Sequence, residues 1–330
     1  MLRRLARIAA IALAALLGLA LAGAVAFIPF GGERTYRFAG SFGEAGDGPG
    51  QFADPTGIAV TAARVFVADA RNGRIQVFDR DGTFRRAFGE PGDGPGQLGR
   101  PMNLTIADRR LYVPEYRNDR VQVFRLDGTP VTTLGGPGTG PGEFRAPGGV
   151  GVLPDGGLLV ADFHNHRVQR LAGDGGFVRQ WGTPGESGTG AGSFAYPTDV
   201  AVTADGGFVV ADSYNDRIQA FTPDGEFRAK WGGPFAMNIH GPFPGWFATV
   251  TGVAVGPEGR VFAADFYNDR IQVFAPDGRF LGAFGRTGTG PGRFRHAIAV
   301  DVAPDGTVYA VDFANARVHI WTPRAGERAG

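Results

Sequence analysis

The sequence predicts an all-β fold, a closed six-bladed β-propeller whose blades have four strands each. Two observations lead to this prediction. One short motif recurs six times at a spacing of 46 to 53 residues, and glycine, 55 of the 330 residues, gathers in the turns and loops around the copies. A period of that length in a chain rich in strand-forming residues is the signature of a propeller blade. Because cysteine is absent, stability has to come from a buried core.

The repeated motif is a hydrophobic pair, an acid, an Asn, an Arg, a β-branched residue and usually a Gln. Two clear copies read VADARNGRIQVF from Val67 and VADSYNDRIQAF from Val210. No helical periodicity is found in the body of the chain. The motif arginines mark the six copies, and they are Arg74, Arg120, Arg167, Arg217, Arg270 and Arg317.

The first copy shows how each blade divides. Gly57–Thr61 is a short apolar strand suited to the crowded axis, and Arg64–Asp69 with Arg74–Phe78 forms a hairpin. The pair Asp81-Gly82 is a tight-turn signal that leads into an outer strand, Thr83–Phe88. A loop rich in Gly and Pro then crosses to the next blade.

The two ends of the repeat region predict ring closure. The sixth copy stops after Arg317–Trp321 and has no outer strand behind it. Before the first copy, Tyr36–Gly43 resembles the outer strand Phe84–Gly89. We therefore expect the N-terminal strand to complete the last blade, which would leave no open sheet edge.

The segment before the repeats is predicted to be a targeting element, residues 1–32. Three arginines precede an uncharged apolar run, 8–30, that is long enough to span a bilayer as one transmembrane helix. This charge order places the body outside the cytoplasm, in the periplasm or the extracellular space. Small residues at 22–26 would also suit signal cleavage, which would give a secreted protein. The propeller is expected over 33–324, followed by a short tail, 325–330.

The charge balance narrows the partners. Beyond residue 30 the chain has 30 basic and 32 acidic residues, a net charge of −2. A nucleic-acid partner is therefore not expected, because nucleic-acid binding relies on a basic surface. The predicted partners are a protein, a peptide or a glycan in the cell envelope, with the membrane bound through the N-terminal helix.

These residues give the chain a family resemblance. From about Thr35 to Pro323 it resembles the NHL-repeat proteins, through the P-x-G-I-A-V entry at Pro55–Val60 and the D-x-x-N-x-R-I-Q hairpin. The resemblance implies a propeller fold but leaves the function open. Such propellers include sensor domains of bacterial receptor kinases, protein- and RNA-binding modules, and a zinc-dependent amidating lyase.

Features shared by all copies are assigned to structure, because one functional site seldom recurs in six equal parts. The acid lies five residues before the motif arginine, so the two are expected to pair across the turn. The motif Asn is explained by its tolerance of left-handed turn geometry. These acids are Asp69, Glu115, Asp162, Asp212, Asp265 and Asp312.

The positions that vary between copies are the candidate site. The turn between the second and third strands is expected on the same face as the crossings, around the mouth of the central channel. Aromatic, Arg and His side chains there are typical of recognition surfaces, although an amphipathic rim around turns is the alternative. The turn positions are Arg71, Tyr116, Arg117, Phe163, His164, His166, Tyr214, Phe266 and Tyr267.

The start of the innermost strand also varies. Met102, Asn103, Asp199 and His296 are expected there, bordering the channel mouth, and the last three are the predicted polar ligand contacts. The alternative for a lone Asp beside a turn is a cap.

One crossing departs from the others. Pro234–Phe247 carries Met237, His240 and Trp246 where other crossings have glycines. This indicates either a loop that covers a ligand or a plug packed over the channel.

Histidines at the mouth raise the question of a metal. His164, His240 and His296 would form a zinc site if they converged, and solvated rim histidines are the alternative. Resemblance to the amidating lyases supports only His296, since those enzymes place histidines at the start of inner strands. The sequence alone assigns no cofactor, and zinc and calcium both stay open. His319, at the Gln position of its strand, is expected to be exposed.

The function predicted from the sequence is binding. The chain is expected to be a membrane-anchored, extracytoplasmic sensor or scaffold module that holds its ligand on the mouth face. The alternative is a metal-dependent lyase or hydrolase in the same place, resembling the amidating lyases.

Overall fold

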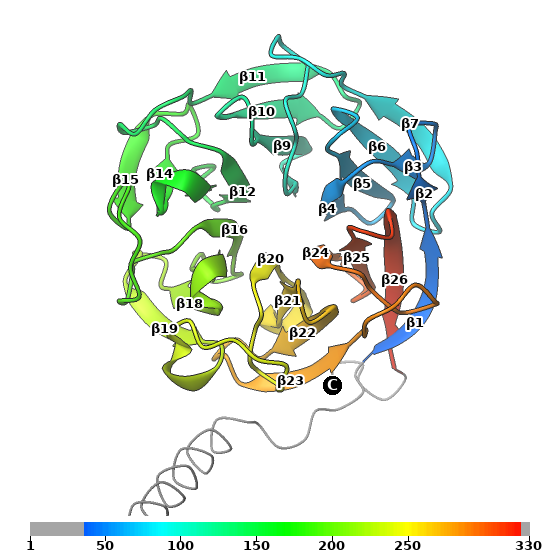
Figure 1. Cartoon of the computed structure of the whole chain (residues 1–330). Coiled ribbons are helices and arrows are strands. Elements are labelled where there is room, and N and C mark those ends of the chain that lie inside the picture. Colours follow the sequence, from blue (N-terminus) through cyan, green and yellow to red (C-terminus); the bar gives the residue numbers. More distant parts are fainter. Residues whose placement is uncertain (1–35, 325–330) are drawn as a thin grey trace, which may run out of the picture.

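The computed structural model describes residues 36–324, and its six four-stranded antiparallel sheets surround a central axis (Figure 1). The predicted six-bladed propeller is confirmed. Within these described residues no helix has the length and apolar character needed to cross a bilayer. The predicted membrane segment, 8–30, and the tail, 325–330, lie outside the described residues.

The strands of each blade run in order from the axis outward. Blade 1 has β4 (Pro55–Val60), β5 (Arg64–Asp69), β6 (Arg74–Asp79) and β7 (Phe84–Phe88). Blade 2 has β8 (Thr105–Ala107), β9 (Arg110–Glu115), β10 (Arg120–Arg125) and β11 (Pro130–Leu134). Blade 3 has β12 (Pro147–Val152), β13 (Leu158–Asp162), β14 (Arg167–Leu171) and β15 (Phe177–Trp181).

The second half of the ring repeats this arrangement. Blade 4 has β16 (Pro197–Val202), β17 (Phe208–Asp212), β18 (Arg217–Phe221) and β19 (Phe227–Trp231). Blade 5 has β20 (Val250–Val255), β21 (Val261–Asp265), β22 (Arg270–Phe274) and β23 (Phe280–Phe284). Blade 6 has β24 (Ala297–Val302), β25 (Val308–Asp312), β26 (Arg317–Pro323) and, outermost, β1 (Tyr36–Phe42).

Short elements lie in the turns and crossings. The first crossing contains two paired strands, β2 (Glu44–Ala45) and β3 (Gln51–Phe52). The remaining elements in residues 36–324 are single 3₁₀ turns, η1 (Phe163–Asn165), η2 (Ser213–Asn215), η3 (Pro234–Ala236) and η4 (Pro257–Gly259). The predicted strand bounds of blade 1 agree with the structure to within two residues.

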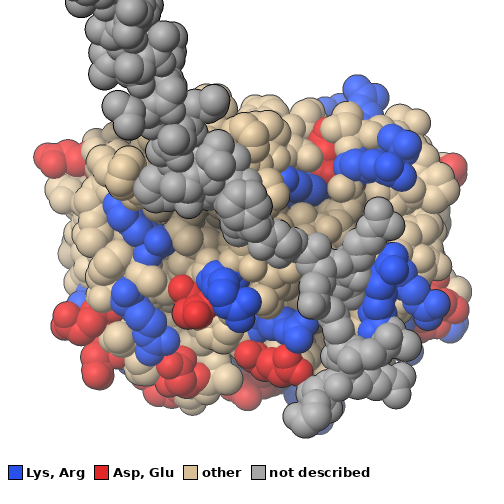
Figure 2. All heavy atoms as spheres, turned by 90° about the horizontal axis from the view of Figure 1, so that it is seen from below, with Lys and Arg blue, Asp and Glu red and all other residues tan. Residues whose placement is uncertain are grey.

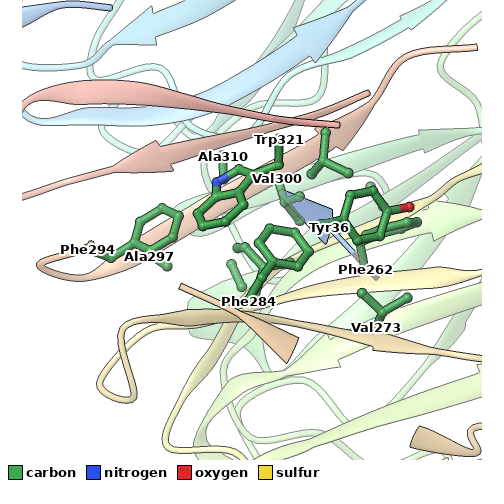
Figure 3. Packing of buried hydrophobic residues seen from close by; sticks show 13 residues of the cluster. Tyr36, Phe262, Val273, Phe284, Phe294, Ala297, Val300, Ala310 and Trp321 are labelled. Atoms are coloured by element: carbon green, nitrogen blue, oxygen red, sulfur yellow. The ribbon is translucent and has the colours of Figure 1, made fainter. Parts of the chain in front are cut away.

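The predicted closure is confirmed. Strand β1 pairs antiparallel with β26, so that Tyr36 lies opposite Pro323 and Phe42 opposite Val318. The side chain of Tyr36 packs against Phe284 of blade 5, with ring centroids 5.0 Å apart. Trp321 lies on the other side of Phe284, at 4.7 Å (Figure 3). Burial of these rings ties the last blade to its neighbour through apolar contact.

The repeated acid and Arg pair as predicted, and together they hold each crossing on its hairpin. In blade 4 one oxygen of Asp212, Oδ2, accepts from Arg217 Nε at 2.7 Å, Asn215 Nδ2 at 2.9 Å and Gln219 Nε2 at 3.1 Å. Its Oδ1 accepts from the backbone N–H of Ala195 at 2.7 Å, in the crossing. The acid and the Arg pair in every blade at 2.6–3.0 Å.

Two predictions about the repeat are wrong. The motif Asn does not itself take the left-handed conformation; the next residue does, with φ of 61° at Gly73 and 54° at His166. The Asn amide instead joins the acid to a crossing carbonyl, as Asn165 does with Gly138 O at 2.9 Å. His319 is buried, not exposed, because its Nε2 lies 3.1 Å from both Asp312 Oδ2 and Arg293 O, where other blades have the Gln amide.

Candidate functional site

The turns between second and third strands and the crossings share one face, as predicted. The backbone N–H of Arg117 donates to Gly99 O at 2.9 Å, and that of His164 to Arg145 O at 3.1 Å. Equivalent bonds occur in the other blades, for example from Tyr214 N to Ala195 O at 3.1 Å. We call this side, formed by turns and crossings, the mouth face.

An aromatic platform extends over the mouth face from blade 2 to blade 4. It consists of Tyr116, Phe163, His164, Tyr196 and Tyr214. The hydroxyl of Tyr116 lies 2.9 Å from His164 Nε2, which joins blades 2 and 3. Ring centroids are 5.0 Å apart for Phe163 and Tyr196, and 4.7 Å for Tyr196 and Tyr214. Side chains from three blades therefore form one continuous surface.

Tyr196 is the member that sequence reasoning missed. It lies just before the inner strand β16, has φ of 52°, and contacts His166 with ring centroids 4.2 Å apart. His166, predicted as a rim residue, is buried, and its Nδ1 accepts from the backbone N–H of Tyr196 at 3.1 Å. Burial, with the nearby His164, lowers the pKa of His166. The signal that would have revealed Tyr196 is variation between copies, since its counterparts are Asp54, Arg100, Ala146, Thr249 and His296.

A second aromatic group lies over blades 5 and 6. The imidazole of His296 stacks on Phe266, with centroids 4.5 Å apart and planes 7° apart, and Tyr267 meets His296 edge-on at 5.6 Å. His296 Nδ1 is 3.8 Å from Asp269 Oδ1 and has no hydrogen-bond partner within residues 36–324. Tyr267 is one of the more exposed residues of the mouth face.

The predicted place of His296 in the inner strand is wrong by two residues. Ala297, not His296, pairs with Asp312, as Pro55 pairs with Asp69 in blade 1. His296 is thus the counterpart of Asp54, and it has the same left-handed conformation, with φ of 69°. His296 therefore precedes the inner strand, and it does not match the inner-strand histidines of the amidating lyases.

The crossing from blade 4 to blade 5 is an ordinary crossing with an insertion. Its second half keeps the usual frame: Gly241 N donates to Phe247 O at 3.1 Å, as Gly46 N does to Phe52 O at 3.0 Å. The extra length lies in 233–240, the eight residues between Gly232 and Gly241, where the first crossing has two. We call 233–240 the insertion.

The insertion presents apolar side chains outward. Phe235 is 65% exposed, Met237 47% and Ile239 42%. The His240 side chain is largely exposed, with Nδ1 4.0 Å from Asp216 Oδ2. Trp246 is buried, with its ring edge-on to Phe243 at 5.0 Å. Of the residues singled out here by sequence, Met237 and His240 thus lie at the surface and Trp246 beneath it.

Basic side chains gather on the mouth face over blades 1 to 3. Arg71 forms two hydrogen bonds with Asp54, at 3.0 and 3.1 Å, and Arg100 lies 3.7 Å from the same carboxylate. Arg117 and Arg145 are exposed and form no ion pair within the described part of the chain. We call these four arginines the basic arc. On the side of the propeller seen in Figure 2, in contrast, acidic and basic side chains are interspersed.

Polar side chains also surround the axis. The buried carboxylate of Asp199 accepts from Val200 N at 2.9 Å and from Val253 N of blade 5 at 2.8 Å. The Asn103 side chain of blade 2 acts to lower the pKa of this carboxyl, against the larger effect of burial. Gly149 of blade 3 leaves room, since a Cβ there would be 2.1 Å from Asp199 Oδ1. Met102 is partly buried at the start of the blade 2 inner edge, where its N–H donates to Pro114 O at 2.9 Å.

Asp301 is a second axial acid that sequence reasoning missed. It accepts from Val302 N at 2.8 Å and from Val60 N of blade 1 at 2.7 Å. Burial raises the pKa of Asp301 to about 7 and, together with the charge of Asp301, raises that of Asp199 to about 8. Both acids cap otherwise unpaired N–H groups of the next inner strand, which is the role foreseen as the alternative for Asp199.

The predicted zinc ligands are not brought together. His164 bonds to Tyr116, His240 lies beside Asp216, and His296 stacks on Phe266. Within residues 36–324 no group of three His, Cys, Asp or Glu side chains has a geometry that could hold a metal ion.

Comparison with protein families settles the kind of repeat. The NHL repeat family model matches residues 52–78, 144–171, 194–221 and 247–274, which are blades 1, 3, 4 and 5 from the end of the crossing to the third strand. This chain is a six-bladed β-propeller that contains NHL repeats. Its blades 2 and 6 keep the same ion pair, with Glu115 and His319 as their departures from the motif.

Curated relatives of this NHL-repeat propeller match only a short stretch. The brain tumor protein of Drosophila melanogaster and the B-box type zinc finger protein ncl-1 of Caenorhabditis elegans are each 51% identical over 45 residues, 13% of this chain. That stretch covers 4% and 5% of their own lengths.

Solved structures share the fold at low identity. A protein of unknown function from Bacteroides thetaiotaomicron aligns with a TM-score of 0.67 and 16% identity, over 88% of this chain and 76% of its own. Virginiamycin B lyase from Staphylococcus aureus with quinupristin aligns with a TM-score of 0.57 and 15% identity. The alignment covers 87% of this chain and 99% of the lyase chain. At such identity the likeness shows the fold alone.

Proposed function

We propose that this NHL-repeat propeller is a protein- or peptide-binding module whose mouth face holds the partner. The observation that supports this most is the aromatic platform. Tyr116, Phe163, His164, Tyr196 and Tyr214 form one surface although they come from three different blades. Aromatic and Arg side chains supply most of the binding energy at protein interfaces, because they bury large areas at little entropic cost.

The contrast between repeated and variable positions supports the same proposal. The acid, Asn and Arg of each hairpin, with the Gln or, in blade 6, His319, are used in holding the crossings. The residues between them are free to differ, and it is these that gather on the mouth face. We further propose that residues 8–30 anchor the propeller to a membrane with its body outside the cytoplasm, or serve as a cleaved signal. A mature protein that begins near residue 33 would support cleavage.

The lyase or hydrolase alternative rests on the sequence resemblance alone. The register of His296 and the separation of the three histidines give it no support, and the virginiamycin B lyase likeness shows the fold only. Bound-metal analysis of the purified full-length chain tests it. Stoichiometric zinc that is lost in His296→Ala would favour the lyase over the binding module.

The binding proposal is tested with matched variants of the full-length chain. One carries Tyr116→Ser, Tyr214→Ser and Tyr267→Ser on the mouth face. Its control carries Val131→Ser, Val178→Ser and Phe227→Ser, exposed apolar residues of the outer strands β11, β15 and β19. We expect proteins that co-purify with the wild type, identified by mass spectrometry, to be retained by the control and lost from the mouth variant. Equal retention by both would contradict the proposal.

A further inference from the structure

We infer that the partner of the mouth face is an extended, acidic protein segment that also carries large apolar side chains. The carboxylates would meet the basic arc, and the apolar side chains would meet the insertion. This inference rests on the proposed function and adds the chemistry and the direction of the bound segment.

The apolar half of the surface lies over blades 4 and 5. Ten large hydrophobic residues are exposed in the described part of the chain, and four of them belong to outer strands. The other six lie on the mouth face, and we call them the apolar patch: Tyr214, Phe235, Met237, Ile239, Phe243 and Tyr267. An exposed apolar patch rimmed by polar residues marks an interaction site.

The insertion is held so that Phe235, Met237 and Ile239 face outward. Its backbone is fixed by Asn238 N donating to Asn215 O at 2.9 Å and by Arg217 Nη1 donating to Ala236 O at 3.2 Å. Phe235, Ala236 and Asn238 all have left-handed φ, between 46° and 58°, a conformation that costs free energy in residues other than glycine. Burial of the insertion side chains by a partner would offset that cost.

The basic half offers charge that the propeller leaves unpaired. Arg117 and Arg145, on blades 2 and 3, have no acid partner within residues 36–324. Nearby carboxylates are already engaged: Asp119 Oδ1 accepts from Ala146 N at 2.6 Å, and Glu143 Oε2 from Gly140 N at 2.9 Å. The arginine guanidinium can donate two parallel hydrogen bonds to one carboxylate, so acidic side chains are its favoured partners. Charge complementarity would then fix the direction of the bound segment.

The aromatic platform connects the two halves. Tyr116 precedes Arg117 in the turn of blade 2, and Tyr214 neighbours the insertion through Asn215. Blades 2, 3 and 4 follow one another around the ring (Figure 1). A segment lying along the platform would therefore contact the basic arc, the rings and the apolar patch in turn.

A membrane is a poorer match for the apolar patch. Tyr36 pairs with Pro323, and β26 begins at Arg317, beside the turn on the mouth face. Strand β1 therefore enters the propeller at the face opposite the mouth. The start of β1 and the apolar patch thus lie on opposite faces of the described propeller. A polyanion without apolar groups would leave the insertion uncovered.

The test measures binding of fluorescent peptides to the full-length chain by anisotropy. The first probe is a short peptide with Asp and Glu at one end and Phe, Leu and Trp at the other. In two matched probes, Lys replaces the acids or Ser replaces the apolar residues. We expect the first probe to bind at least about tenfold more tightly than either of the others. Polyglutamate and vesicles of anionic lipid serve as competitors, and neither is expected to displace it.

Two pairs of variants locate the bound probe. Arg117→Glu with Arg145→Glu should weaken the acidic–apolar probe about tenfold and remove most of its salt dependence, whereas Arg110→Glu, on the opposite face, should not. Met237→Ser with Ile239→Ser should weaken it similarly, whereas Val178→Ser should not. Equal binding of all three probes, or displacement by polyglutamate or vesicles, would overturn the inference. If the probe fails but proteins still depend on Tyr116, Tyr214 and Tyr267, the inference falls and the proposed function stands.

Discussion

The crossings from blade 2 to blade 3 and from blade 4 to blade 5 perform the same structural task with different surfaces. In both, a Gly N–H bonds to the Phe carbonyl that precedes the inner strand: Gly138 to Phe144 at 3.0 Å, and Gly241 to Phe247 at 3.1 Å. In both, the hairpin Arg donates to the crossing carbonyls. The second crossing differs by the insertion, 233–240, which adds apolar surface without disturbing this frame. We call the hydrogen bonds that hold each crossing on its hairpin the frame. The insertion shows that the exposed surface of a crossing can change while the frame is kept.

The largest expected effect comes from breaking the frame where it is most buried. Asp212→Ala would leave Arg217, which is fully buried, without its counter-charge, together with the unpaired amides of Asn215 and Gln219. We expect a loss of about 3–5 kcal/mol in the free energy of unfolding, measured by urea denaturation.

Blade 1 supplies the matched control for this variant. The Arg74 side chain is 18% exposed, so water can solvate it when its acid is removed. We expect Asp69→Ala to cost less than Asp212→Ala. Equal losses would show that burial of the ion pair does not decide the cost.

A second effect follows from the axial acids and concerns pH. In the unfolded chain Asp199 and Asp301 titrate near pH 4, whereas burial raises their pKa values to about 8 and about 7 in the native state. Between about pH 4 and pH 8 the native state therefore holds protons that the unfolded state has lost. The contribution of these two acids to the free energy of unfolding should therefore fall as pH rises through this window.

Denaturation curves at several pH values between about 5 and 8 measure that slope. The variant Asp199→Asn with Asp301→Asn should have a flatter dependence, even if its stability is lower throughout. Asp205 and Asp305, whose pKa values are lowered to about 2 by hydrogen bonds to Thr203 and Arg80, act only in acid and do not affect this window. If the free energy of unfolding of this variant depended on pH as steeply as that of the wild type, Asp199 and Asp301 would not be the groups responsible.

The frame was predictable from the sequence because it repeats. Six copies of one motif fixed the fold, the pairing of acid and Arg, and the closing role of Tyr36–Gly43. The site was only partly predictable, because a residue that occurs once is recognised by where its neighbours place it. Asp301 became visible only through its contact with Val60. Tyr196 varies between copies, but its place in the aromatic platform became visible only through its contact with Tyr214. Trp246 was recognised as unusual, but its burial depends on how Gly241 and Phe243 pack over it.

Register explains the clearest error. The sixth copy lacks the Pro that begins most other inner strands, and Ala297 takes its place opposite Asp312. Without that Pro the sequence does not mark where the inner strand begins. His296 is therefore aligned with Thr56, two positions beyond its true counterpart, Asp54. Strand pairing, which the sequence does not display, supplies the correction.

Removal of the insertion should change stability little. Replacement of residues 233–240 by Arg-Thr, the pair between Gly285 and Gly288, would copy the crossing from blade 5 to blade 6. The hydrogen bonds lost include those from Ala236 N to Gly233 O, from Asn238 N to Asn215 O and from Arg217 Nη1 to Ala236 O, but three strained residues go with them. We expect thermal unfolding to shift by no more than the equivalent of about 1 kcal/mol. A collapse of the fold would show that the insertion is part of the frame.

The smallest expected effect on stability is that of Tyr214→Ser. Its ring is 56% exposed, and its contact with Tyr196 is at the surface. We expect the free energy of unfolding to stay within about 0.5 kcal/mol of the wild type, while partner binding falls sharply. A large loss of stability would assign Tyr214 to the frame instead.

The central claim, that partners bind the mouth face, is tested most directly by photo-crosslinking in intact cells. A photoreactive amino acid is placed at 214, 237 or 267 on the mouth face, and at 131, 178 or 227 on the outer strands. We predict discrete protein adducts from the three mouth positions and none from the outer strands. Adducts from the outer strands alone, or from both sets equally, would contradict it.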